Sequence, residues 1–219
     1  MSLNIARTKS QPVRAATREL LLEAAGEVFA DAGFRAATMR EICRRAGANV
    51  AAVNYHFGDK ERLYLEVLLH AHRRSLDLYP TDAGIGPDAP AEEQLKVFVH
   101  GFLRWILASG PLAWHGKLIA MEMIQPTAAL DALREVSLQP LADEVRGIVE
   151  RLLGPGASPE IVRLCGCSIV SQCLFYIHCR SVISRLFPEQ KYGESDIALL
   201  AEHITQFSLS ALKGFAASV

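Results

Sequence analysis

The chain has 219 residues, of which half are apolar and 21% are charged. This composition supplies enough apolar side chains for a core, so it excludes an intrinsically disordered protein, and the length suits one domain or two small ones. The formal net charge is −1. Taken as a total, this charge disfavours a nucleic-acid partner, because nucleic-acid-binding domains are usually basic.

Cysteine usage and hydropathy indicate a reducing compartment and no membrane span. The five cysteines are an odd number, and four of them lie within residues 165–179, which is poor spacing for a disulfide framework. Residues 1–14 contain bases without the apolar run that a secretory signal needs. The longest uncharged segment, 164–179, is shorter than the roughly 20 residues of a transmembrane helix. We therefore expect a cytoplasmic protein in which this segment is a buried helix.

The charges are unevenly distributed along the chain. Residues 1–74 hold 12 Lys or Arg and 8 Asp or Glu, a balance of +4, whereas residues 75–219 hold 11 and 16, a balance of −5. Such asymmetry is typical of a protein whose basic end contacts a polyanion, although a split of this size also arises by chance in solvated surfaces.

The first part of the chain predicts three short helices. Apolar residues at helical spacing form the stripe of the first helix, namely Leu21, Ala24, Ala25, Val28 and Phe29. We expect that helix to end at Gly33, where a left-handed residue is favoured. Thr38 and Glu41 have the spacing of a capping box, which starts a second helix at Met39. Gly47 interrupts it after about two turns, and Asn49 can cap a third helix that runs to Phe57.

The rest of the chain also predicts helices. Asp59 can cap a fourth helix that ends at Leu78, and a stretch rich in Pro and Gly follows at 79–90. Beyond it, five segments are expected to be helical: Ala91–Ser109, Leu112–Gln125, Thr127–Leu153, Pro159–Phe187 and Ser195–Ala217. Pro140 should kink the third of these. Alternating β-branched runs are absent from the sequence, so we expect an all-α fold with domains at 1–60 and 61–219 and a linker near 79–90.

The last two predicted helices are apolar on more than one face. Pro159–Phe187 is apolar around most of its circumference, and Ser195–Ala217 carries apolar residues beside its main stripe. Such helices are buried on two sides, either in one large core or in an interface. We favour a homodimer in which this pair meets its symmetry mate as a four-helix bundle.

Two short helices joined by a tight glycine-containing turn have the geometry of a helix-turn-helix, whose second helix fits the major groove. Val53 and Phe57 should face the core beside Ile42 and Ala46. The remaining positions of the third helix are then available to solvent or DNA: Ala51, Ala52, Asn54, Tyr55 and His56. Asn suits adenine, alanine methyls suit thymine, and Tyr and His suit phosphate.

Residues 17–68, TRELLLEAAGEVFADAGFRAATMREICRRAGANVAAVNYHFGDKERLYLEVL, closely resemble the DNA-binding domain of TetR-family transcriptional regulators. The matching elements are AxxxFAxxGFxxATxRxIxxxAG and a short helix that ends in YHFxxKExL. Members of that family are dimeric, all-α regulators, usually repressors that a small ligand releases from DNA. The resemblance therefore implies a dimer on a palindromic duplex operator, released by a small apolar ligand.

Position by position, the resemblance implies that nine residues contact phosphates or bases: Arg40, Asn49, Val50, Ala51, Ala52, Asn54, Tyr55, His56 and Lys60. Asn54 stands where many members carry Tyr, so the base preference of those members does not carry over. Arg44 and Arg45 either add contacts to the DNA backbone or remain solvated. The segments AMEMIQPTAAL and SIVSQCLFYIHCRSVI, together with NYHFGDK, resemble the CecR-like subgroup, whose members are associated with drug sensitivity and efflux genes.

A small-molecule effector would need an apolar and aromatic pocket with a few polar anchors. The candidate lining residues are Trp105, Trp114, His115, Met121, Met123, Gln172, Phe175, Tyr176 and His178, each of which is otherwise an ordinary core residue. Gln172 and His178 are favoured as anchors, because a polar group in a buried stretch needs a partner. The fourth helix is the expected lever between ligand and DNA.

Other functions are disfavoured by the residue patterns. Cys165, Cys167, Cys173 and Cys179 lie near His178, but Cys165 and Cys167 point to different faces of a helix, so we expect no metal. The sequence lacks HExxH, GxSxG, P-loop and Rossmann glycine patterns, and we expect neither a cofactor nor an enzyme. A helical enzyme or a protein–protein adaptor remains the alternative.

Overall fold

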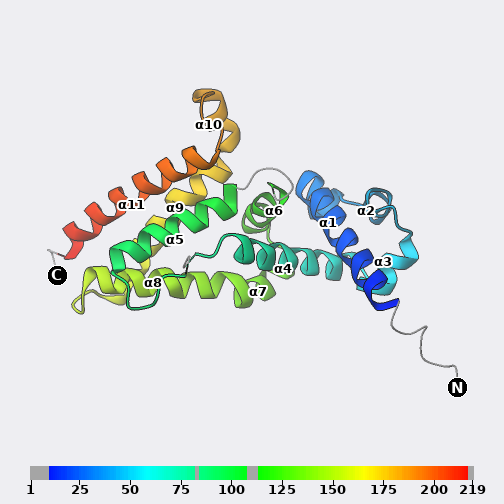
Figure 1. Cartoon of the computed structure of the whole chain (residues 1–219), viewed down its shortest axis with the longest axis horizontal. Helices are drawn as coiled ribbons and strands as arrows, with labels where there is room; N and C mark the ends of the chain where they lie inside the picture. The colour runs from blue at the N-terminus through cyan, green and yellow to red at the C-terminus, as the bar shows by residue number, and fades with distance from the viewer. Residues whose placement is uncertain (1–9, 82–83, 108–112, 217–219) are drawn as a thin grey trace, which may run out of the picture.

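The computed structural model describes residues 10–81, 84–107 and 113–216, with side chains from residue 16 onwards. These residues form α-helices and one π-helical segment and contain no β-strand, which confirms the all-α prediction (Figure 1). The helices are α1 (Ser10–Ala36), α2 (Met39–Ala46), α3 (Val50–Phe57), α4 (Lys60–Leu78), α5 (Ala91–Leu107), α6 (Ala113–Ile124), α7 (Ala129–Leu133), the π-helical η2 (Arg134–Leu138), α8 (Gln139–Leu153), α9 (Pro159–His178), α10 (Arg180–Leu186) and α11 (Glu194–Ala216).

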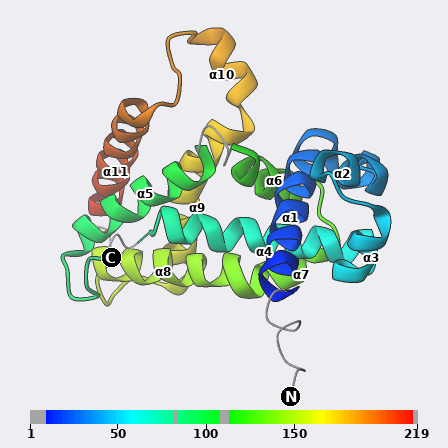
Figure 2. The ribbon, with the colours of Figure 1, turned by 45° about the vertical axis from the view of Figure 1, so that its right-hand side comes forward.

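Helices α1 to α3 form a small unit, called the head here, and α5 to α11 form a larger one, called the body. In Figures 1 and 2 the head lies at one end of the molecule, and α4 leaves it to run along the body. Helix α4 packs against α1 on one side and against α6 and α7 on the other. One contiguous apolar core extends from Leu21 in α1 to Leu212 in α11. The two units are therefore joined by packed helices as well as by the chain.

In the body, α5, α8, α9 and α11 pack against one another. Of the apolar residues that the sequence placed on one face of the last helix, four are buried: Ile197, Ala201, Ile204 and Leu212. Leu200 is half-buried, and Ala211 and Phe215 are exposed. Helix α10 stands away from the rest of the body in both views. The Arg180 guanidinium lies 4.8 Å above the ring of Tyr192, which ties α10 to the segment that precedes α11.

Two of the predicted helices are interrupted. The segment expected as Thr127–Leu153 divides into α7, η2 and α8, and Pro140 occupies the first turn of α8, where its missing N–H is tolerated. The segment expected as Pro159–Phe187 divides at Cys179, whose backbone leaves the helical region at φ −96° and ψ 11°. Instead of a kink at Pro140, the chain changes from the π-helix η2 to the α-helix α8 just before that residue. The prediction of one continuous helix over Pro159–Phe187 was wrong. Residues 108, 109, 112 and 217 of the predicted helices lie outside the described residues.

Helix α9 is the one described helix that is long and apolar enough to cross a membrane by length and composition. It packs along α8, with further contacts to α5 and α11. Core helices of soluble proteins satisfy the same length and composition test, so the packing of α9 gives it a structural role in the body.

Candidate functional site

The ends of α2 and α3 are fixed by local residues. The Thr38 hydroxyl accepts a hydrogen bond from the Glu41 amide at 3.2 Å, and the Asn49 side chain accepts one from the Ala52 amide at 2.8 Å. Gly47 adopts the left-handed conformation, with φ 61° and ψ 28°, that ends α2 and turns the chain into α3. The predicted caps and the glycine turn are confirmed, and they give the two helices the form of a helix-turn-helix.

Helix α3 has one buried face and one exposed face. Val53 and Phe57 are buried with Ile42 of α2, as predicted from their spacing, and the Arg18 guanidinium lies 5.4 Å above the Phe57 ring. The opposite face presents a continuous outward surface: Val50, Ala51, Asn54 and Tyr55 are exposed, and Ala52 and His56 are half-buried. An eight-residue helix of this kind can enter a major groove without rearrangement of the core.

The basic residues near α2 and α3 are held differently from one another. The Arg44 guanidinium binds the Glu41 carboxylate through two hydrogen bonds of 2.8 and 2.7 Å, and Arg45 reaches Glu41 at 3.2 Å. Hydrogen bonds from Arg44 and then Arg45 lower the pKa of Glu41 to about 2. Arg45 also reaches Glu27 and Asp31 of α1, at 3.4 Å in each case. Both arginines are therefore paired with carboxylates while they remain exposed.

Arg40 belongs to α2, which precedes α3, and Lys60 is the first residue of α4, which follows it. Arg40 is exposed and forms no ion pair with any described residue. The Lys60 ammonium donates to the Arg35 carbonyl at 3.3 Å and lies 4.8 Å above the Phe34 ring. These contacts hold Lys60 at the start of α4, beside the end of α3, where a phosphate contact is geometrically accessible.

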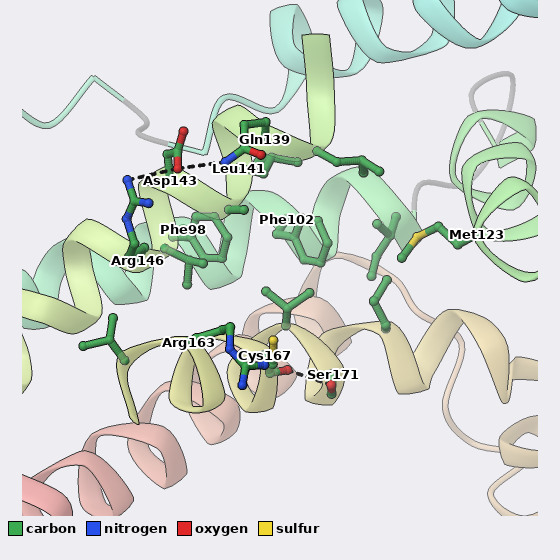
Figure 3. A pocket seen from close by; sticks show the side chains of 18 of the residues that line it. Phe98, Phe102, Met123, Gln139, Leu141, Asp143, Arg146, Arg163, Cys167 and Ser171 are labelled. Carbon is green, nitrogen blue, oxygen red and sulfur yellow. Dashed lines mark hydrogen bonds and ion pairs between the residues drawn. The ribbon is translucent and has the colours of Figure 1, made fainter. Parts of the chain in front are cut away.

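The body contains a cavity of about 650 Å³ between α5, α6, α8 and α9. Phe98 and Phe102 of α5 lie in its centre, and Met123 of α6 lies toward one end (Figure 3). Gln139, Asp143 and Arg146 border it from α8, and Arg163, Cys167 and Ser171 border it from α9. The volume is that of a small-molecule site, and most of the wall is apolar.

The residues predicted to line a ligand pocket are not all brought together. Trp105 and Met123 line this cavity. Gln172 lies instead in a groove of about 270 Å³ between α9 and α11, where its side chain donates to the Ser208 hydroxyl at 3.2 Å. Phe175 and His178 are exposed and Tyr176 is half-buried; none of the three lines either cavity.

The other three predicted residues lie where α6 packs on the head. Trp114 donates from its indole nitrogen to Glu23 of α1 at 3.3 Å, and its ring fills the space beside Gly26, where an added Cβ would approach within 2.4 Å. His115 is buried and lies 3.3 Å from the Ser75 hydroxyl of α4, and Met121 contacts Gly33. These side chains connect the two units and do not line the cavity.

Sequence reasoning missed the charged residues of the cavity. Arg146 and Arg163 are exposed helical arginines, a pattern that normally indicates a solvated face. The two arginines line the same cavity because α8 and α9 pack side by side (Figure 3), and the sequence alone does not show this packing. A signal was present in α9, because Arg163, Cys167 and Ser171 recur every four residues and interrupt its apolar surface.

A buried polar contact connects α4 with α6. The Tyr64 hydroxyl donates to the Glu122 carboxylate at 2.8 Å, and the Thr127 amide and hydroxyl donate to its other oxygen at 2.7 and 3.0 Å. Glu122 is fully buried, and burial together with its hydrogen bond to Glu122 raises the pKa of Tyr64. Three donors satisfy a carboxylate that would otherwise be costly to bury.

Two family models match this chain. One is described as bacterial regulatory proteins of the TetR family and matches residues 21–67, which span α1 to the first half of α4. The other is the C-terminal domain of the HTH-type transcriptional dual regulator CecR and matches residues 91–212, more than half of the chain. The chain belongs to the TetR family of transcriptional regulators. Its C-terminal domain is of the CecR type, which confirms the subgroup indicated by the sequence.

Individual relatives agree with this assignment. The transcriptional regulator UidR of Escherichia coli is 34% identical over 70 residues, so the chain spans about a third of the length of that relative. The transcriptional repressor NicS of Pseudomonas putida is 26% identical over 90% of this chain and 92% of its own. The solved complex of AibR with isovaleryl coenzyme A and operator DNA has a TM-score of 0.66 at 15% identity, covering 87% of this chain and 97% of that one, and so shares the fold.

Proposed function

We propose that this TetR-family regulator is a ligand-responsive repressor whose head binds duplex DNA and whose body binds a small molecule. The observation that carries the proposal is the position of α6. Ile119 and Met123 of this helix line the cavity, whereas Trp114 and Lys117 contact α1 of the head. An occupant of the cavity therefore touches a helix that also packs on the DNA-binding unit. A difference in ligand affinity between two placements of α6 would become a difference in DNA affinity.

Helix α3 is the proposed recognition helix. Its exposed face supplies Asn54 for a base edge and Tyr55 for a phosphate, and Arg40 and Lys60 flank it with positive charge. The remaining proposed contacts come from Asn49, Val50, Ala51, Ala52 and His56. Arg44 can reach DNA only by sharing or leaving Glu41, and Arg45 is further tied to α1, so we place both at the edge of the interface.

We propose that a homodimer forms through the outer faces of α9, α10 and α11. These helices expose large apolar side chains that soluble monomers rarely cluster: Leu164, Phe175, Val182, Leu186, Phe187, Leu199, Phe207 and Phe215. The groove between α9 and α11 is lined partly by three of them. A two-fold pairing of this surface forms a four-helix bundle and sets the spacing of the two heads on a palindromic operator. We place the regulator in the cytoplasm, where DNA is accessible.

We infer from the CecR-type C-terminal domain that efflux or detoxification genes are the targets. AibR, which shares the fold, binds both a coenzyme A thioester and operator DNA. A helical enzyme or adaptor without DNA binding is the competing proposal. We place the functional boundary near residue 60, where α4 begins, with the linker at 79–90.

The test is a footprint on the DNA upstream of the protein's own gene, repeated with a panel of compounds. We expect protection of two half-sites separated by about one helical turn, and loss of protection with at least one compound. Failure to protect any segment would contradict DNA regulation at that locus. Protection that no compound changes would contradict the sensor function alone.

A further inference from the structure

The body cavity has two chemically different ends. Phe98, Phe102 and Met123 form an apolar row along it, and Arg146 and Arg163 lie near Phe98, on opposite sides of the cavity, at the end away from Met123 (Figure 3). Phe98 is almost completely buried, whereas both arginines are exposed, so the charged end meets solvent; Met123 at the other end is 39% exposed. A ligand that fits this wall has an apolar body and one polar end.

Among the charged residues that line this end of the cavity, the two arginines outnumber the single carboxylate of Asp143. Asp143 is already bound by Arg146 at 3.0 Å and by the Gln139 amide at 3.0 Å, and Arg146 also approaches Glu150 at 3.8 Å. Arg163 forms no ion pair with any residue in the described part of the chain. Pro159 lines the same cavity at the N-terminal end of α9, where the helix dipole is positive. This end therefore favours an anion over a cation.

The opposite end of the wall is apolar. Trp105 lines the cavity and is 3% exposed, and its indole nitrogen is buried. Trp105 follows Phe98 by two turns of α5, a rise of about 10 Å, which an extended chain of about eight carbons covers.

We propose that the cavity binds an anionic amphiphile, with its anionic group on Arg163 and its medium-length apolar chain along Phe98 and Phe102 toward Trp105. The proposal rests on the ligand site of the proposed function and names its ligand class. It replaces the purely apolar ligand that the sequence indicated. A free carboxylic acid carries its anionic group at the head of the chain, whereas a coenzyme A thioester is neutral there and carries its anionic phosphates beyond the pantetheine arm.

The test is calorimetric titration of the full-length protein without DNA, using decanoate, decan-1-ol, decyltrimethylammonium and decanoyl-coenzyme A as probes. We expect decanoate to bind about tenfold more tightly than the alcohol and the cation, because only the anion gains a charge-assisted bond. Tighter binding of the thioester than of decanoate would identify the thioester as the form that is sensed, and the reverse order would identify the free acid.

Matched variants test the contact with the anion. Arg163→Met should reduce decanoate affinity about tenfold, to that of the alcohol, whereas Arg134→Met, on an exposed arginine outside the cavity, should leave it unchanged. Equal binding of acid and alcohol, or an Arg163→Met variant that binds decanoate normally, would overturn the proposal.

The same titration distinguishes this inference from the proposed function. Binding is measured without DNA, so failure of the probes to bind would reject the ligand class while leaving a footprint on DNA unaffected. Conversely, probe binding by a protein that fails to protect DNA would reject the regulatory function and leave the cavity's ligand class intact.

Discussion

Tyr64 of α4 and Glu122 of α6 are joined by a buried hydrogen bond of 2.8 Å. Glu122 precedes Met123, which lines the cavity, and the Tyr64 ring packs edge-on at 4.9 Å against Phe29 of α1. Glu122 and Tyr64 therefore connect Met123 in the cavity wall with Phe29 in the core of the head. It offers a physical route by which α6 can influence the DNA-binding unit, in addition to the direct packing of Trp114 on α1.

Removal of this bond should destabilise the fold and weaken the link. Tyr64→Phe keeps the ring but leaves one oxygen of a buried carboxylate without its donor, and we expect a loss of about 1–3 kcal/mol in unfolding free energy. Tyr55→Phe, which removes a hydroxyl from an exposed side chain, should change stability by less than about 0.5 kcal/mol. Urea unfolding of both variants checks the difference. Equal stability of the two would mean that the Tyr64 hydroxyl is not a significant donor.

The packing of α6 on the head predicts opposite effects at two helical glycines. Gly26→Ala places a Cβ within 2.4 Å of the Trp114 ring, which cannot move without shifting α6, so we expect a loss of about 1–3 kcal/mol. Gly147→Ala in α8 meets nothing within 4 Å and should gain about 0.5–1 kcal/mol from helix propensity. Thermal unfolding separates them, and a stabilised Gly26→Ala variant would contradict the close packing.

Stability should fall in mild acid because of His115. Burial lowers the pKa of this imidazole to about 4, so the unfolded chain takes up a proton near pH 6.5 that the folded protein does not. Stability is then highest above pH 6.5 and decreases as the pH falls toward 4, by about 2 kcal/mol between pH 7.5 and 5. His72, whose pKa burial also lowers, acts in the same direction.

Urea unfolding at the two pH values checks this dependence, with His115→Gln as the comparison. The substitution removes the titrating group, so the variant should lose less stability on acidification than the wild type. Parallel losses in the two proteins would show that other groups cause the acid sensitivity.

The exposed apolar faces of α9 and α11 predict a dimer. Phe207 is 61% exposed in the single chain, and Phe207→Glu places a charge on the proposed interface without touching the core. We expect light scattering at micromolar concentration to report a dimer for the wild type and a monomer with unchanged helicity for the variant. Leu20→Glu, at an equally exposed leucine of the head, should remain dimeric. A monomeric wild type would contradict the interface.

The sequence predicted the local features well and the long-range ones poorly. Thr38, Gly47, Asn49 and Asp59 act on residues within one turn, so their roles follow from spacing alone, and all four do so in the structure. The break at Cys179 depends on how α10 meets the segment around Tyr192, which no local pattern encodes.

The candidate ligand site shows the same limit. Trp114 and Trp105 look alike in sequence, yet one packs on α1 and the other lines the cavity, because the neighbouring helices decide where each ring lies. Arg163 was missed because an exposed helical arginine normally indicates a solvated face, and the four-residue spacing with Cys167 and Ser171 was not used. The net charge of −1 was also misleading, because it is the sum of +4 for residues 1–74 and −5 for residues 75–219.

The contacts proposed for α3 predict different defects for different side chains. Tyr55→Ala and Lys60→Ala should weaken binding to all duplexes, because phosphate contacts are independent of sequence. Asn54→Ala should instead relax preference at one base position. Fluorescence anisotropy with a set of operator variants checks this, and unchanged affinity in all three proteins would contradict the assignment of α3.

The most direct test of the central claim is the salt dependence of binding to the duplex upstream of the protein's own gene. For a dimer that presents two heads to DNA, we predict specific binding whose logarithmic affinity falls linearly and steeply with the logarithm of salt concentration. Equal affinity for this duplex and for unrelated DNA, or binding that is insensitive to salt, would contradict the account.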